Sequence, residues 1–146
     1  MKDDIMGRLR GLAIGIAASI LLLAGGADAA APKRVKVSGD IIDTWCYITE
    51  IMYALGTAHH RCAIWCAVGG IPVSLKGNDG NTYMVLKMEG DATSVANPAI
   101  LKIQSHEVSV EGDLYERDGV KYLIVTQVHD DKGVVNMTHE EHGVQP

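Results

Sequence analysis

The chain has 146 residues, of which 47% are hydrophobic and 21% are charged. This composition can fold around one core, and the length excludes a large multidomain enzyme. Eighteen acidic side chains against thirteen basic ones give a net charge of -5, so no basic surface is expected to attract nucleic acid. Three cysteines and six histidines are too few for a disulfide scaffold and sufficient for one metal or thiol site.

Residues 1–29 have the features of an export signal. Basic residues at positions 2, 8 and 10 precede an apolar stretch over residues 11–26, and Ala-Asp-Ala at 27–29 is the small-x-small pattern that signal peptidases read. The apolar stretch is shorter than the roughly 20 residues of a membrane-spanning helix. We therefore expect a cleaved signal peptide, no stable membrane span after cleavage, and a periplasmic or extracellular protein. A retained N-terminal anchor is the alternative.

The first predicted strand begins at Val35 and has a period of two, with Val37 and Ile41 on one face. Gly39 interrupts this pattern as a β-bulge would. The strand is expected to run on through residues 45–47 and to carry Cys46 at its end.

A helix is predicted next, over residues 57–68. Thr57 can cap its first turn, Ile64 and Val68 are four residues apart, and Gly69-Gly70 end it. This helix interrupts a chain that is otherwise patterned as strands.

Strands are then predicted at 72–75 and 82–88 around a hairpin turn at 77–81, and at 106–115 and 120–128 around a turn at 116–119. A short helical turn at 97–101 separates the two pairs, because Pro98 follows an asparagine that can cap a helix. Residues 131–146 are expected to form a polar, flexible tail.

These elements predict an all-β fold, a five-stranded OB-like Greek-key barrel over residues 30–130 with a short Cys/His-bearing helix inserted at about 45–70, after the first strand. The strand patterns are Val-x-Gly-x-Ile-x-Asp at 37–43 and Val-x-Val-x-Gly at 108–112, and the insertion carries Cys-Tyr at 46–47, His-x-x-Cys-Ala at 59–63 and Gly-x-Pro at 70–72. In these motifs the chain resembles small exported bacterial OB-fold proteins with an inserted Cys/His motif, an uncharacterised secreted family. The resemblance implies fold and export, and no activity.

All three cysteines lie between residues 46 and 66. On a helix, His59, Cys62 and Cys66 stand at i, i+3 and i+7 and share one face, which Cys46 can approach if the intervening chain folds back. Three thiolates and one imidazole form a tetrahedral Cys3His set suited to zinc, copper or iron. We therefore predict a transition-metal site at Cys46, His59, Cys62 and Cys66. His60 is rotated by about 100° from this face and is expected to face solvent or to support a ligand from outside the set.

A disulfide is the main alternative, because exported proteins commonly form them. Residues four apart on a helix hold their Cβ atoms about 6 Å apart, whereas a disulfide needs roughly 3.8 Å. Cys46 would then pair with Cys62 or Cys66 and leave one odd thiol. A reactive-thiol role for Cys62 or Cys66 is the third interpretation.

Three aromatic residues flank the cysteines in sequence: Trp45, Tyr47 and Trp65. They are expected to wall the site or to pack the insertion against the barrel. Asp43 is expected to orient an imidazole or, more simply, to be a solvated carboxylate. His106 and His129 have no partner evident in the sequence.

The tail holds a second set of donors, Met137, His139 and His142, with Glu140 or Glu141. They could capture copper or nickel, although a mobile polar tail is the simpler interpretation.

The preferred interpretation is an exported metal-binding protein, serving in electron transfer or as an accessory subunit of a larger exported complex. No Ser-His-Asp order, phosphate-binding loop or close carboxylate pair points to catalysis, so a protein that is not an enzyme is favoured. The alternative is a disulfide-stabilised periplasmic binding module of the OB type, whose ligand is a small molecule, a glycan or a partner protein.

Overall fold

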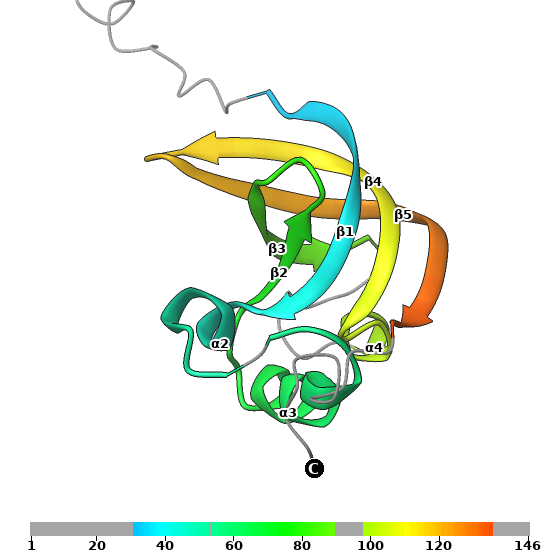
Figure 1. The fold of residues 1–146 in the computed structure, drawn as a ribbon. Coiled ribbons are helices and arrows are strands. Elements are labelled where there is room, and N and C mark those ends of the chain that lie inside the picture. The colour runs from blue at the N-terminus through cyan, green and yellow to red at the C-terminus, as the bar shows by residue number, and fades with distance from the viewer. Residues whose placement is uncertain (1–30, 53, 90–97, 136–146) are drawn as a thin grey trace, which may run out of the picture. The chain divides into compact units, whose positions relative to one another are not determined.

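The computed structural model describes residues 31–52, 54–89 and 98–135. Within these residues, short helices are inserted between strands, and all of them lie at the same end of the strand assembly (Figure 1). The elements in chain order are β1 (Lys33–Asp43), α2 (Thr44–Thr49), α3 (Gly56–Val68), β2 (Val73–Gly77), β3 (Thr82–Met88), α4 (Pro98–Lys102), β4 (His106–Arg117) and β5 (Val120–Val134).

The strands close into a barrel in the order β1-β2-β3-β5-β4, and β4 pairs back onto β1. The β3–β5 pair is parallel and the other pairs are antiparallel. Alternate residues of β4, such as Val108, Val110 and Leu114, point into the core, because successive side chains of a strand face opposite sides. The all-β, OB-like barrel predicted from the sequence is confirmed.

Gly39 lets β1 pair with two strands at once. It is aligned with Gly77 of β2 and with Val108 of β4, and both registers run without a shift. The predicted bulge at Gly39 is therefore wrong. A Cβ atom at this position would lie 2.0 Å from the backbone oxygen of Lys76, so glycine is required because the two backbones approach so closely.

The end of β1 is covered on both faces. Ile41 and Ile42 are each 0% exposed, although consecutive strand residues point in opposite directions. Ile41 belongs to the barrel core, and α2 and α3 contact the strand. The strand therefore enters a region that is buried on both sides.

A helix that the sequence analysis missed follows at once. The carboxylate of Asp43 accepts a hydrogen bond of 2.9 Å from the backbone N–H of Cys46, which caps the first turn of α2. The predicted continuation of the strand through residues 45–47 is wrong, and Cys46 lies on a helix.

The predicted helix at 57–68 is confirmed as α3, with a different start. It begins one residue earlier, at Gly56, whose φ is 65°. Leu55 occupies the cap position in an extended conformation, so Thr57 is not the cap. The Gly69-Gly70 pair ends the helix as expected, with φ of 96° at Gly70.

The last strand extends beyond its predicted end at residue 128, and it includes residues 131–134, which were expected to belong to a flexible tail. His106 of β4 is aligned with Val134 of β5, and an ion pair joins Lys132 to Glu107. This end of the β4–β5 pair is held by polar contacts between the strands, because its side chains are not buried in the core. Met137, His139, Glu140, Glu141 and His142 lie outside the described residues.

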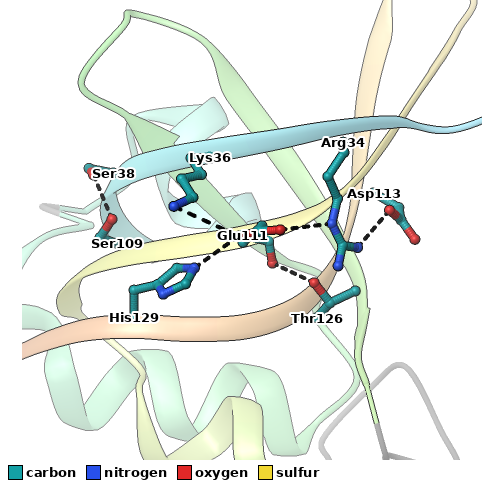
Figure 2. Close-up of polar contacts among 8 residues, drawn as sticks. All are labelled: Arg34, Lys36, Ser38, Ser109, Glu111, Asp113, Thr126 and His129. Atoms are coloured by element: carbon teal, nitrogen blue, oxygen red, sulfur yellow. Dashed lines mark hydrogen bonds and ion pairs between the residues drawn. The ribbon is translucent and has the colours of Figure 1, made fainter.

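A polar network covers the outer face of β1, β4 and β5 (Figure 2). The carboxylate of Glu111 accepts hydrogen bonds of 3.0 Å from both His129 and Arg34, and these two donors hold the pKa of Glu111 below its usual range. Arg34 also donates to Asp113 at 2.8 Å. His129, which had no partner evident in the sequence, thus belongs to a network of polar side chains that satisfy one another. Of the helices in the described part of the chain, none is both long and apolar enough to cross a membrane.

Candidate metal centre

Two helices bring the three cysteines together beside the end of β1. Cys46 comes from α2, and Cys62 and Cys66 come from successive turns of α3. Their sulfur atoms all lie within 4.8 Å of one another, and the sulfurs of Cys62 and Cys66 are 4.0 Å apart. Cys46 is buried and the other two are partly exposed. All three are free thiols, so the cluster can offer three sulfur donors to one ion.

A second group of donors shares Cys46. One atom each from Asp43, Cys46 and His59 lie within 4.8 Å of one another, and all three residues are buried. His59 is 0% exposed, and within the described part of the chain neither of its ring nitrogens has a hydrogen-bond partner. The Oδ2 atom of Asp43 also has none among these residues.

An unpartnered, fully buried imidazole requires an explanation. Leaving a buried polar group without a partner costs about 1–3 kcal/mol, and buried polar side chains in proteins are nearly always satisfied. Burial lowers the pKa of His59, which Asp43 raises to a lesser extent. The ring is therefore neutral at pH 7, and the neutral form is the one that binds metal ions.

Burial and the same carboxylate raise the pKa values of two of the thiols. Burial, followed by the charge of Asp43, raises the pKa of Cys46 to about 11. The nearby carboxylate of Asp43, together with burial, raises the pKa of Cys66 to about 12. A bound cation would lower the pKa values of these thiols, because it stabilises the thiolates. It would also offset the negative charge of the carboxylate.

The structure brings together the residues that the sequence analysis selected, in two overlapping groups. Cys46, Cys62 and Cys66 form one group, and His59 lies with Cys46 in the other. Asp43 was expected to be a solvated carboxylate or to orient an imidazole. It is 2% exposed, so the first alternative is wrong, and it lies in the same group as His59, as the second requires. The only available signal was an aspartate immediately before a helix, which is a common capping residue.

The aromatic residues near the cysteines do not enclose the cluster. Trp45 is 49% exposed and Trp65 is 70% exposed, so the expectation that they wall the site is wrong for both. They belong instead to the exposed apolar surface of α2, α3 and the segment between them, together with Ile48, Ile51, Met52 and Val68.

His60 contributes to the contact between α3 and the barrel. Its Nδ1 atom is hydrogen-bonded to the backbone oxygen of Gln104 at 2.8 Å, and its ring stacks on that of His106 at 6.2 Å between centroids. His106 in turn contacts Asp131 at 2.7 Å. The expectation that His60 faces solvent or supports a metal ligand is thus not met, because its described contacts place it between α3 and β4.

Comparison of the chain with protein-family models, with curated proteins and with solved structures finds no match. The function proposed below therefore depends on the arrangement of these side chains.

Proposed function

We propose that this chain is an exported protein that binds one transition-metal ion, zinc, copper or iron, through Cys46, Cys62, Cys66 and His59. The observation that carries the proposal is the buried imidazole of His59, which is unpartnered among the described residues and lies beside Cys46, a member of the cluster of three thiols. A metal ion would supply the missing partner of the ring and the positive charge that the thiols and Asp43 lack.

The donor set favours a binding or electron-transfer role over hydrolysis. Three thiolates and an imidazole fill the four positions of a tetrahedral ion, whereas hydrolytic metal sites keep one position open for water. We propose that the protein holds its ion as an electron-transfer or accessory subunit of a larger exported complex, in the periplasm or outside the cell.

The first experiment is metal analysis of the mature protein purified from its own host, with intact mass measured under native and denaturing conditions. We expect one stoichiometric metal ion in the native state and three free thiols after denaturation. Cys46→Ser should lose the ion. The control is His129→Gln, which should retain the ion, because His129 lies in β5 and belongs to the polar network of Figure 2.

A metal-free protein whose denatured mass is lower by two hydrogen atoms would contradict the proposal. That result would indicate one disulfide and would favour the alternative, a binding module of the OB type in which the disulfide holds the helices as a lid. In the structure, the sulfurs of Cys62 and Cys66 are 4.0 Å apart, about twice the length of a disulfide bond.

A further inference from the structure

Met52 places a thioether beside the thiol cluster. The Sγ atom of Cys62 is 3.9 Å from the Sδ atom of Met52, in the segment between α2 and α3. Met52 is 50% exposed, whereas Cys46 is buried. It also lines a hollow of about 680 Å³ together with Tyr47 of α2. The thioether therefore lies on the solvent side of the cluster, in contact with one of the sulfurs that would bind the ion.

A thioether discriminates between metals. It is neutral and polarisable, and with thiolates it forms the soft ligand set that suits copper(I). Zinc in proteins is bound by thiolate, imidazole and carboxylate groups, so a methionine adds little to a zinc site. We propose that, for copper(I), Met52 takes the place of His59 as the fourth ligand beside the three thiolates and makes the site selective for copper(I) over zinc, an inference that rests on the proposed metal-binding function.

Competition with chromophoric chelators tests this inference. The mature, metal-free protein is titrated in one series with copper(I) under a reductant and in another with zinc. Met52→Leu should weaken copper(I) binding by about 10-fold or more, the size of effect expected for a residue that tunes a metal site, and should leave zinc binding unchanged. Met84→Leu is the matched control, because Met84 lies in β3 of the barrel, and it should change neither affinity.

A second readout identifies the ligand directly. In selenomethionine-labelled protein, X-ray absorption at the copper edge should show a copper–selenium distance that is absent from the Met52→Leu variant. Equal copper(I) affinities for wild type and Met52→Leu, or a parallel loss of zinc affinity, would overturn the role of Met52 while leaving the metal-binding function in place. A wild-type protein that binds neither of these ions, nor iron, would overturn the proposed function itself.

Discussion

Replacement of His59 by leucine should move the stability of the metal-free and metal-bound proteins in opposite directions. In the metal-free protein, the substitution removes two buried ring nitrogens that have no hydrogen-bond partner among the described residues. Removing such a group relieves about 1–3 kcal/mol, and a change of shape at similar volume costs less than about 1.5 kcal/mol. We therefore expect His59→Leu to stabilise the metal-free protein by about 1 kcal/mol, which is a rise of about 4 °C in Tm for a domain of this size.

The metal-bound protein should respond in the opposite sense. An ion present at 100 times its Kd stabilises the folded state by about 2.7 kcal/mol. If the loss of the imidazole weakens binding by about 100-fold, the upper end of the range for residues that tune a metal site, the contribution of the same ion concentration falls to about 0.4 kcal/mol. The loss of about 2.3 kcal/mol exceeds the gain of about 1 kcal/mol, so the variant becomes less stable than the wild type in the presence of metal.

Urea denaturation of the mature protein, with a chelator or with excess zinc, measures both effects. His60→Leu is the control, because His60 bonds to Gln104 and stacks on His106 away from the cluster. It should lower the free energy of unfolding by a similar amount in both conditions. A loss of about 3 kcal/mol or more for metal-free His59→Leu, the size expected for a well-packed and satisfied core side chain, would refute the reasoning.

Further predictions concern the barrel and the protons of the site. Gly39→Ala should destabilise the protein by about 1–3 kcal/mol or more in denaturant titrations, because its Cβ would meet the Lys76 oxygen at 2.0 Å; wild-type stability would show that β1 and β2 can separate at no cost. Burial raises the pKa of Tyr83 to about 12, and the 2.6 Å hydrogen bond from the phenol to the Asp79 carboxylate adds to this; Asp79→Asn should therefore lower the pKa of Tyr83 in part, and ultraviolet titration of the phenolate checks this. The raised pKa of Tyr83 also means that its contribution to stability is complete below about pH 10, the pKa of an unfolded tyrosine, and is lost as the pH approaches about 12. Metal uptake should release protons and tighten as the pH rises, because the pKa of the Cys66 thiol is raised to about 12; an indicator dye in weak buffer that detects no proton release would contradict this.

Much of the barrel could be predicted because its signals are local. Alternating apolar residues mark the strands, and the glycine-rich turn between β2 and β3 marks a hairpin. Two elements were missed, for different reasons. Helix α2 has six residues, too few for a helical period to emerge, and its start is decided by the side chain of Asp43. The end of β5 is polar in sequence and is a strand because β4 supplies partners for it.

The candidate site divides in the same way. The spacing of His59, Cys62 and Cys66 on one helix is a local property, and it predicted their common face. The burial of Asp43 is not local, because it arises only when α2 and α3 contact the end of β1. Trp45 and Trp65 show the converse error. Proximity in sequence suggested proximity to the sulfurs, whereas α2 and α3 each leave their indole exposed.

The position of the cluster at the end of β1 has a consequence for how the protein matures. The end of this strand, Ile41 to Asp43, pairs with β2, and its pairing with β4 stops at Asp40. Small zinc-dependent domains fold around their ion, and here all the donors come from one continuous segment, residues 43–66, which is short enough for an ion to contribute to its folding. If the ion is acquired after export, the metal content of the protein reports the metal supply of the compartment to which it is exported.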